Sequence, residues 1–327
     1  MNIQQALKKS TNKFKLQNIP SADLDAEVLL LEALNKIGVH SLKCNRSCSN
    51  QIKTSYRLKP ELRKDKSWLY AHNDYKLTKN EEGLFKNFIN QRKKHKPVAY
   101  ITNRKEFYGY EFYVDENVLI PRPETEIIVE EVLKILNNKI QRKFTLIDIG
   151  TGSGCIIISI LNELTKNKNN KVIHSAYAND ISQEAIKIAK VNAEKYNLNK
   201  KIKFVENNFE KFLDKKNIYS SNELITTANL PYIKDNEYEN LLPNVRKYEP
   251  KTALVGGEDG LVYIKKLIES ILKIKEKYKQ KIYIFIEADP SQISEITAII
   301  NKKLANAHIK IIKDLNGKKR IAILSHC

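Results

Sequence analysis

The sequence lacks any long apolar segment. No run in its 327 residues approaches membrane-spanning length, and the first residues, Met1 to Lys9, contain no apolar signal core. These absences argue against a membrane anchor and predict a soluble, cytoplasmic protein without membrane partners. The chain also has no internal repeat, which argues against a repeat architecture.

Cysteine is scarce as well. The cysteines are Cys44, Cys48, Cys155 and Cys327, and Cys44-x3-Cys48 lacks a second pair of candidate ligands. The sequence therefore predicts free thiols in a reducing cytosol, with no disulfide framework and no metal site.

Acidic residues are too few to balance the basic ones. Lys and Arg together number 57 against 38 Asp and Glu, which gives a net charge of +19. Such an excess indicates an anionic partner such as RNA or a ribonucleoprotein, and hence proximity to RNA or the ribosome. Compositional bias is the alternative, because lysine is scattered through every segment and often stands beside asparagine.

The N-terminal part of the chain has the pattern of helices. Apolar spacing predicts helices over 3–17 and 22–36, whereas the stretch 38–64 gives no assignment. Thr78 and Glu81 have the spacing of a capping box, which predicts the start of a helix that runs to about Lys94.

The rest of the chain has the pattern of an α/β domain. β-prone aromatic residues around Gly109 predict a hairpin over Tyr100–Val114. From Phe144 onward, strands and helices alternate, which predicts a largely parallel sheet. The length allows two domains, and 42% hydrophobic residues suffice for packed cores.

A glycine-rich segment suggests a nucleotide-binding loop. An apolar strand ends at Asp148, and Gly150, Gly152 and Gly154 then precede an apolar run that begins at Cys155. This order predicts a strand, a tight loop and a helix, with backbone N–H groups close to a ligand at the helix start. A nicotinamide-binding fold is the alternative, but its Gly-x-Gly-x-x-Gly pattern needs the third glycine one position later.

The next apolar segment ends in an acidic residue. The run Val172–Ala178 is followed by Asn179 and Asp180. A carboxylate at the tip of the second strand is suited to bind both hydroxyls of a ribose. The alternative is that Asp180 only favours the start of a helix through the helix dipole.

The sequence Asn229-Leu230-Pro231-Tyr232 follows a third apolar strand. An amide or aromatic amine nitrogen is a poor nucleophile, so a site must orient its lone pair toward the methyl donor. The Asn229 oxygen can accept one N–H and the Leu230 carbonyl the other, because Pro231 keeps the preceding residue extended. The Tyr232 ring can close the slot and interact with a sulfonium through its face.

Together with the glycine segment, these residues predict a methyltransferase that uses S-adenosylmethionine. No general base is assigned, since the proton can leave after methyl transfer. An ordinary turn after a strand is the alternative reading of Asn229–Tyr232, because Asn and Pro both favour turns.

Several further motifs resemble the release-factor glutamine N5-methyltransferases of the HemK/PrmC type, and the resemblance spans most of the chain. The motifs that carry it are Leu24-Asp-Ala-Glu-Val-Leu-Leu, Pro97-Val-Ala-Tyr-Ile, Glu106-Phe-Tyr-Gly109, Leu119-Ile-Pro-Arg-Pro-Glu-Thr-Glu126, Asp148-Ile-Gly-Thr-Gly-Ser-Gly154, Glu249-Pro-x-x-Ala-Leu and Asp314-Leu-Asn-Gly.

The string Pro121-Arg-Pro-Glu-Thr-Glu126 discriminates between related families. The ribosomal-protein glutamine methyltransferases are similar in the catalytic domain but usually have a Pro-Arg-Ser version there. Pro123 and the acids after it would also start a helix well. That explanation accounts for the prolines and Glu124, but not for Arg122.

The resemblance implies roles for individual residues. Cofactor binding is implied for Gly150, Thr151, Gly152, Ser153, Gly154, Asp180, Asn208, Phe209 and Asn229. Catalysis is implied for Asn229 and Tyr232, and substrate binding for Asn229, Leu230, Pro231, Tyr232, Phe107, Arg122 and Glu124. Asn208 stands where the family has an acid beside the adenine, so a hydrogen bond to the adenine amino group is in doubt.

Leu230 departs from the Asn-Pro-Pro-Tyr that is usual in the family. Asn-Leu-Pro-Tyr also resembles the rRNA adenine N6-dimethyltransferases, and the net charge favours that alternative. Against it stand the N-terminal helical part, the Glu106–Gly109 segment and the Pro121–Glu126 string, none of which that family needs. A catalytically inactive module that binds release factors or ribosomes is a third hypothesis.

The resemblance implies a Rossmann-like, seven-stranded class I methyltransferase domain over 121–327. It also implies an N-terminal helical substrate-recognition domain over 1–95 and a β-hairpin linker over 96–120. The expected enzyme is a monomer that methylates the glutamine of the Gly-Gly-Gln loop in class 1 peptide-chain release factors. The alternatives are an rRNA adenine N6-methyltransferase and a ribosomal-protein glutamine methyltransferase.

Overall fold

The chain forms two compact units, Met1–Asn103 and Arg104–Cys327. The computed structural model describes residues 1–40, 64–138, 142–167, 172–214, 223–278, 281–304 and 307–326. The division falls inside the segment 96–120 that the sequence assigns to a linker. Most of the stretch 38–64 and three of the cysteines, Cys44, Cys48 and Cys327, lie outside the described residues.

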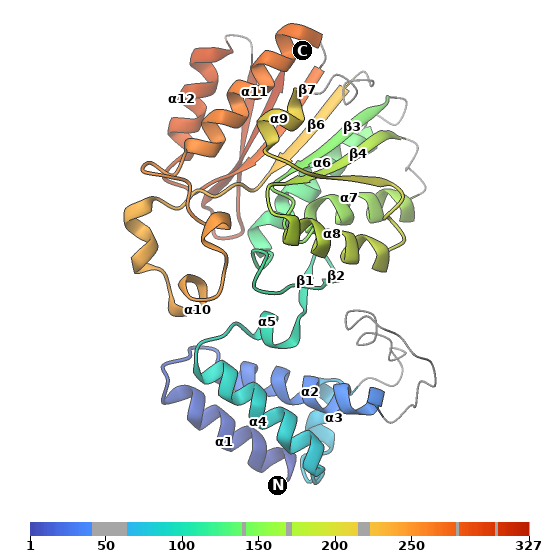
Figure 1. Ribbon diagram of the computed structural model, residues 1–327, viewed down its shortest axis with the longest axis vertical. Coiled ribbons are helices and arrows are strands. Elements are labelled where there is room, and N and C mark those ends of the chain that lie inside the picture. Colours follow the sequence, from blue (N-terminus) through green and yellow to red (C-terminus); the bar gives the residue numbers. More distant parts are fainter. Residues whose placement is uncertain are drawn as a thin grey trace. The chain divides into compact units, whose positions relative to one another are not determined.

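The N-terminal unit is helical, as predicted. Its helices are α1 (Ile3–Lys15), α2 (Ala22–His40), α3 (Lys66–Ala71), α4 (Lys79–Lys93) and α5 (Val98–Thr102). They enclose an apolar core to which α1, α2 and α4 contribute most of the side chains (Figure 1). None of the helices in the described part of the chain combines the length and hydrophobicity that crossing a bilayer requires.

The capping box at the start of α4 is confirmed. The Thr78 hydroxyl accepts a hydrogen bond from the Glu81 N–H at 3.2 Å, and the Glu81 carboxylate accepts one from the Thr78 N–H at 2.8 Å. An ion pair in the same unit joins Asp25 of α2 to Arg92 of α4 at 2.6 Å, with both side chains buried. The two helices are thus joined by this ion pair as well as by the apolar side chains of the core.

The predicted hairpin is shorter than expected. Residues 100–102 belong to helix α5, which ends at Thr102 and is capped by Asn103 with φ of 56°, so their assignment to a strand was wrong. The strands are β1 (Lys105–Phe107) and β2 (Tyr110–Phe112), which pair antiparallel. Tyr108 and Gly109 both have positive φ, which is the backbone geometry of a tight two-residue hairpin turn.

The larger unit contains the predicted parallel sheet. Within the described residues its seven strands have the order β5-β4-β3-β6-β7-β9-β8. All neighbours up to β7 are parallel, whereas β9 runs antiparallel to β7 and β8. The strands are β3 (Phe144–Ile149), β4 (Ile173–Asp180), β5 (Ile202–Glu206), β6 (Glu223–Ala228), β7 (Lys281–Glu287), β8 (His308–Lys313) and β9 (Lys319–His326).

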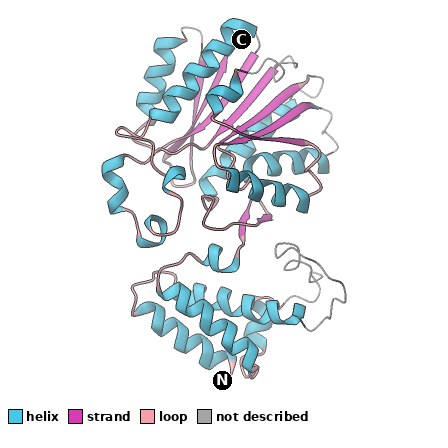
Figure 2. Cartoon of the chain, in the orientation of Figure 1, coloured by secondary structure: helices cyan, strands magenta, loops and turns pink. Residues whose placement is uncertain are grey.

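Helices cover both faces of this sheet (Figure 2). Successive residues of one strand enter different cores, because side chains alternate across a strand. Leu146 packs with the helices of one face and Ile147 with those of the other. The first face carries α6 (Glu126–Asn138), α7 (Cys155–Lys166) and α8 (Gln183–Lys195), and the second carries α9 (Phe209–Leu213), α11 (Val262–Tyr278) and α12 (Ile293–Lys303).

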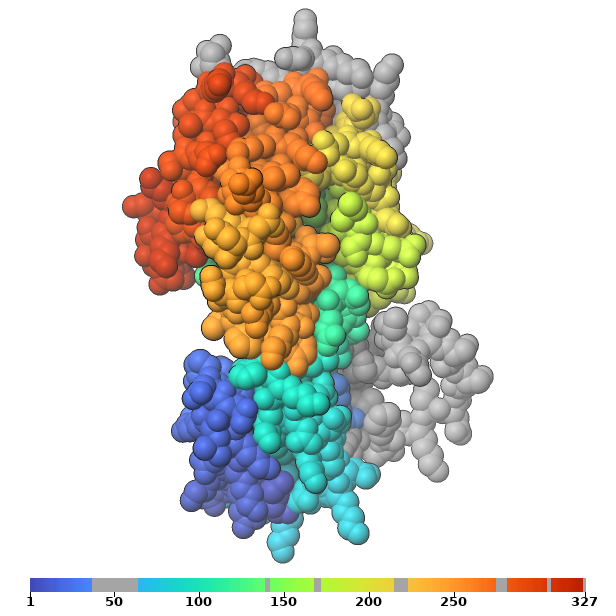
Figure 3. All heavy atoms as spheres, turned by 60° about the vertical axis from the view of Figure 1, so that its left-hand side comes forward, coloured from blue at the N-terminus to red at the C-terminus, as the bar shows by residue number. Residues whose placement is uncertain are grey.

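The remaining short elements lie in loops of the larger unit. They are the 3₁₀ helices η2 (Pro123–Thr125), η5 (Asp235–Asn240) and η6 (Lys251–Ala253) and the short helix α10 (Pro243–Arg246). The segment from η5 to η6 forms a continuous, yellow-orange part of this unit's surface (Figure 3).

The strand order reverses between β3 and β6. After β3 the chain moves outward through β4 and β5, then returns to the other side of β3 as β6 and continues outward to β7. The loops after β3 and β6 therefore diverge and leave a crevice at the carboxyl ends of the strands, where ligands bind in open α/β sheets.

A buried carboxyl group ties the loops of this crevice together. Asp148, in β3, is fully buried and accepts hydrogen bonds from the hydroxyls of Thr151 at 2.7 Å and Thr227 at 2.8 Å. Thr151 belongs to the glycine-rich loop and Thr227 to the end of β6. Burial raises the pKa of Asp148 to about 6, against the opposing effect of these hydrogen bonds.

We expect Asp148→Asn to change the pH dependence of stability. The raised pKa means that protonated Asp148 stabilises the fold at low pH, and that this contribution is lost as pH rises through about 6. Wild type should therefore lose about 1.4 kcal/mol relative to the variant between about pH 5 and about pH 8. Denaturant unfolding of both proteins at the two pH values measures this, and parallel curves would contradict it.

Candidate functional site

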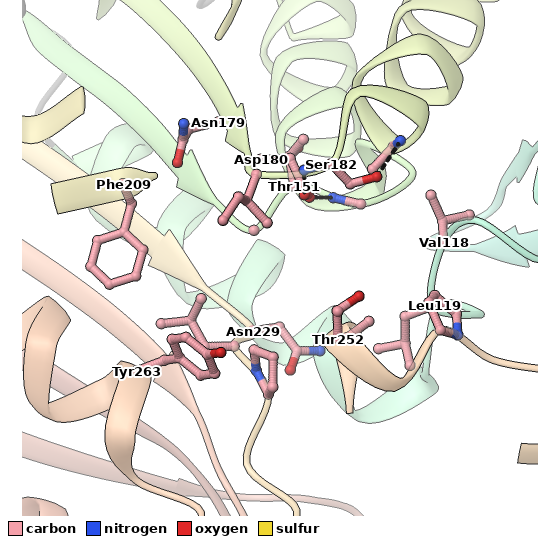
Figure 4. A pocket seen from close by; sticks show the side chains of 18 of the residues that line it. Val118, Leu119, Thr151, Asn179, Asp180, Ser182, Phe209, Asn229, Thr252 and Tyr263 are labelled. Carbon is pink, nitrogen blue, oxygen red and sulfur yellow. Dashed lines mark hydrogen bonds between the residues drawn. The ribbon is translucent and has the colours of Figure 1, made fainter. Parts of the chain in front are cut away.

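A cavity of about 240 Å³ lies at the carboxyl ends of β3, β4 and β6. Its lining comes from segments that are far apart in the sequence and that meet at the reversal of strand order. The lining includes Val118, Leu119, Thr125, Gly150, Thr151, Gly152, Ser153, Cys155, Asn179, Asp180, Ser182, Asn208, Phe209, Asn229, Leu230, Pro231, Thr252 and Tyr263. Phe209 and Tyr263 lie at one end of it, and Val118 and Leu119 at the other (Figure 4).

The glycine-rich loop adopts the backbone geometry that its sequence predicts. Gly150, Gly152 and Gly154 all have positive φ, a conformation that L-residues with a side chain rarely adopt. Within the loop, the Thr151 N–H donates to the Asn179 carbonyl, the Gly152 N–H to the Asp180 carboxylate and the Gly154 N–H to the Thr151 carbonyl.

Asp180 fastens the glycine-rich loop to the end of β4. One carboxylate oxygen accepts the Gly152 N–H at 2.9 Å, and the other accepts the Ser182 N–H at 2.9 Å. Burial raises the pKa of Asp180, and these two hydrogen bonds oppose the shift. The carboxylate is therefore held in a fixed orientation at the cavity wall, with lone pairs left for a ligand.

The wall near Phe209 is aromatic and contains one tethered amide. Asn208 caps α9, and its side-chain oxygen accepts the Glu210 N–H at 2.9 Å. This hydrogen bond fixes the orientation of the Asn208 side chain at the start of the helix. Phe209 and Tyr263 offer ring faces on which a flat heterocycle can stack.

Asn229 is held by a hydroxyl from a distant part of the chain. Its side-chain nitrogen donates to the Thr125 hydroxyl at 3.1 Å. Thr125 ends η2, inside the Pro121–Glu126 string. This contact leaves the Asn229 oxygen as the group that can accept a hydrogen bond from a ligand.

The residues after Asn229 are clamped by a neighbouring loop. Leu230 is buried against Gly150, where a Cβ atom would lie 3.3 Å from the leucine Cδ2. The Tyr232 carbonyl accepts the Gln292 side-chain N–H at 2.9 Å, and Gly256 donates to the Ile233 carbonyl at 2.8 Å. The Leu230 side chain thus packs against the glycine-rich loop, and these hydrogen bonds hold the backbone that follows it.

Five of the predicted site residues, Gly154 among them, do not line this cavity. Phe107 is buried in the apolar core, and Arg122 forms an ion pair at 2.6 Å with the buried Glu249. Glu124 and Tyr232 are also absent from the lining. The ion pair gives Arg122 a structural explanation that the sequence alone does not provide, since it joins the Pro121–Glu126 string to the Glu249 motif.

Gly154 is a fifth such residue. It lies at the start of α7, and a Cβ atom there would come within 2.9 Å of Ile158.

Cys155 lines the cavity as a free thiol. Burial raises the pKa of this thiol to about 12, so it is not a nucleophile at neutral pH.

Two protein-family models match the chain. The family model of the PrmC N-terminal domain matches residues 38–102, and that of a methyltransferase domain matches residues 140–308. The release factor glutamine methyltransferase of Leptospira interrogans is 35% identical over 98% of this chain and 96% of its own length. That of Bacillus anthracis is 32% identical over 80% of this chain and 87% of its own.

The chain belongs to the release factor glutamine methyltransferase family. A third relative with that name, from Fusobacterium nucleatum, is 32% identical over 98% of this chain and 86% of its own length. Among solved structures, the N-terminal domain of human METTL16 in complex with SAH has 17% identity and a TM-score of 0.44. The matched region covers 67% of this chain and 76% of the METTL16 chain.

Some residues of the cavity have no signal in the sequence. Tyr263 belongs to no motif, and Thr252 occupies a variable position of the Glu249-Pro-x-x-Ala-Leu motif; both reach the cavity because η6 and α11 fold over it. Thr125 lies inside a motif shared with the family, but its partner Asn229 is about 100 residues away. Asn179 precedes Asp180 in the sequence, and its side-chain amide donates to the Val205 carbonyl at 3.0 Å, which joins β4 to β5.

Gly150→Ala should destabilise the protein more than Gly317→Ala. Both glycines have positive φ, so an alanine costs about 1–2 kcal/mol at either position. Only at Gly150 does the new methyl also crowd Leu230, which should add about 1 kcal/mol. Urea unfolding of the two variants measures the difference, and equal losses would show that Leu230 does not press on the loop.

Proposed function

We propose that this protein transfers a methyl group from S-adenosylmethionine to the side-chain amide of a glutamine in a peptide-chain release factor. Membership of the release factor glutamine methyltransferase family supports the reaction class. The observation that carries the proposal is the placement of Asn229 in one cavity with the glycine-rich loop, Asp180 and Phe209.

The cavity fits the parts of S-adenosylmethionine. Asp180 has a fixed carboxylate for the ribose hydroxyls, and Phe209 and Tyr263 provide stacking surfaces for the adenine. The turn through Gly150 and Gly152 keeps side chains away from the space between these groups and Asn229. When bound, the cofactor supplies an electrophilic methyl group.

The loop after β6 is suited to hold the glutamine amide. The Asn229 oxygen can accept one N–H, and the Leu230 carbonyl can accept the other because Pro231 fixes its direction. Burial raises the pKa of the Tyr232 phenol, so this ring stays neutral. The Asn229 oxygen and the Leu230 carbonyl orient the nitrogen lone pair, and the proton leaves after transfer without a dedicated base.

A protein substrate is favoured over RNA. The relatives named above are release factor enzymes, and the chain matches the PrmC N-terminal domain model, which an RNA adenine methyltransferase does not need. The finer assignments rest on the resemblance: a class 1 release factor, the Gly-Gly-Gln loop, substrate recognition by the N-terminal unit, and a monomeric, cytoplasmic enzyme. Proximity to the ribosome would use the net charge of +19.

Asp180→Ala should weaken S-adenosylmethionine binding by about 1–3 kcal/mol, because the ribose loses its charged acceptor. Isothermal titration calorimetry measures the change. Glu184→Ala is the matched control, since Glu184 is an exposed acid on α8 that pairs with Lys187 outside the cavity. Unchanged affinity in the Asp180 variant would remove this residue from the cofactor site.

Labelled S-adenosylmethionine should methylate a class 1 release factor and not ribosomal RNA. The label should vanish when the glutamine of the Gly-Gly-Gln loop is replaced by alanine, because the slot beside Asn229 is proposed to hold that amide. Asn229→Ala should lower the rate by about 100-fold, the usual effect of losing one preorganised polar contact. Label on RNA alone would overturn the proposal.

A further inference from the structure

We propose that a second cavity of the larger unit, at the amino ends of β4 and β5, binds the phosphate backbone of RNA. This cavity has a volume of about 310 Å³ and shares no lining residue with the cavity around Asn229. The choice of RNA among polyanions rests on the proposed function, since a release factor works at the ribosome. The position of the site does not depend on that function.

The second cavity arises because β4 begins before its neighbour at the edge of the sheet. The ladder between β4 and the edge strand β5 starts where Ala176 lies opposite Ile202. The first residues of β4, Ile173–Ser175, therefore extend past the start of that ladder, and the turn into β5 leaves a hollow beside them. Leu161 and Thr165 of α7 form a further part of the lining.

The side chains around this hollow are basic. Lys200, Lys201 and Lys203 line it, from the turn before β5 and the start of that strand. His174 of β4 is a further member of the lining, which contains no acidic residue within the described part of the chain. This basic cavity is thus a concave surface of one charge sign, and such a surface concentrates the field that attracts an anion.

The three lysines differ from those of the neighbouring helices α7 and α8. Lys166 of α7 pairs with a glutamate at 3.0 Å, and Lys187 of α8 pairs with another at 2.6 Å. Among the described residues, by contrast, no carboxylate forms an ion pair with Lys200, Lys201 or Lys203. Their charges are therefore not neutralised within this part of the chain and are available to a ligand.

Two contacts orient lysines of the basic cavity without neutralising them. The Lys201 ammonium group donates to the Thr165 hydroxyl at 3.4 Å. The Lys203 ammonium group lies 5.2 Å from the centre of the Tyr177 ring, which belongs to the residue opposite it in the β4–β5 ladder. Since an ammonium group has three N–H donors, both lysines keep donors for phosphate oxygens.

A phosphate backbone fits these features. Lysine binds phosphate as a point charge, and such contacts need no particular base sequence. The three lysines follow one another along the chain at the edge of the sheet, which suits the repeated charges of a strand better than a single phosphate ion. The net charge of +19 predicts an anionic partner, and the basic cavity gives that partner a position.

The basic cavity is remote from the proposed methyl transfer. Ile173, at the start of β4, lines the basic cavity, and Asp180, at the end of the same strand, lines the cavity around Asn229. At about 3.3 Å for each residue of a strand, these two residues lie about 23 Å apart. RNA bound at the lysines thus leaves the cofactor site open, and it is held as a partner rather than as the methyl acceptor.

The test is RNA binding by the full chain, measured as the fluorescence anisotropy of a labelled single-stranded RNA at several salt concentrations. The triple variant Lys200→Gln, Lys201→Gln, Lys203→Gln should bind RNA about 10-fold more weakly at low salt. The slope of log affinity against log salt should become shallower by about 2, because each phosphate contact on a single strand contributes about 0.7. The affinity for S-adenosylmethionine should stay within about twofold of wild type, since the cofactor site is distant.

The matched control is the triple variant Lys302→Gln, Lys313→Gln, Lys319→Gln. These lysines are also exposed and form no ion pair with a carboxylate of the described residues. They belong to α12, β8 and β9, and β8 is the edge of the sheet opposite β5. The control removes the same charge from the same unit, so its RNA affinity should stay within about twofold of wild type.

Equal losses of RNA affinity in the two triple variants would show that binding depends only on net charge, and would overturn the inference. Absence of RNA binding by wild type would do the same. Displacement of RNA by inorganic phosphate at matched ionic strength would assign the basic cavity to a single phosphate ion and contradict the proposal for RNA. The anisotropy measurement contains neither cofactor nor release factor, so failure of the proposed function leaves its result unchanged.

Discussion

The site depends on the buried carboxyl group of Asp148. By accepting hydrogen bonds from Thr151 and Thr227, it joins the glycine-rich loop after β3 to the strand that leads into Asn229. Asp180 makes a similar connection between the same loop and β4. Three loops that would otherwise move separately are therefore fixed against one another at the reversal of strand order, and the cavity between them has a defined shape.

Fixed loops matter because the proposed chemistry offers no strong nucleophile and no base. An amide nitrogen reacts only if its lone pair points at the methyl donor, so positional control must supply the rate. The contacts found around Asn229 are of this kind: Thr125 binds its nitrogen, Leu230 packs on Gly150, and the loop of Gly256 clamps the backbone beyond. Family membership and geometry thus support the same reaction.

The sequence predicts local features better than distant ones. The capping box of Thr78, the strands before Gly150 and Asn229, and the glycine turn follow from neighbouring residues, and the structure has them. Residues 100–102 were wrongly assigned to a strand, because β-prone aromatic residues are also accommodated in a short helix. Thr125 and Tyr263 could not be found, since only the packing of η2 and α11 brings them to the cavity.

The most direct test of the central claim is a crystal structure of the protein with S-adenosylhomocysteine and a peptide that contains Gly-Gly-Gln. The account predicts that the glutamine side-chain nitrogen lies about 3 Å from both the Asn229 oxygen and the Leu230 carbonyl. It also predicts that the ribose hydroxyls contact Asp180. A glutamine amide held by other residues, or placed outside the cavity after β6, would contradict the account.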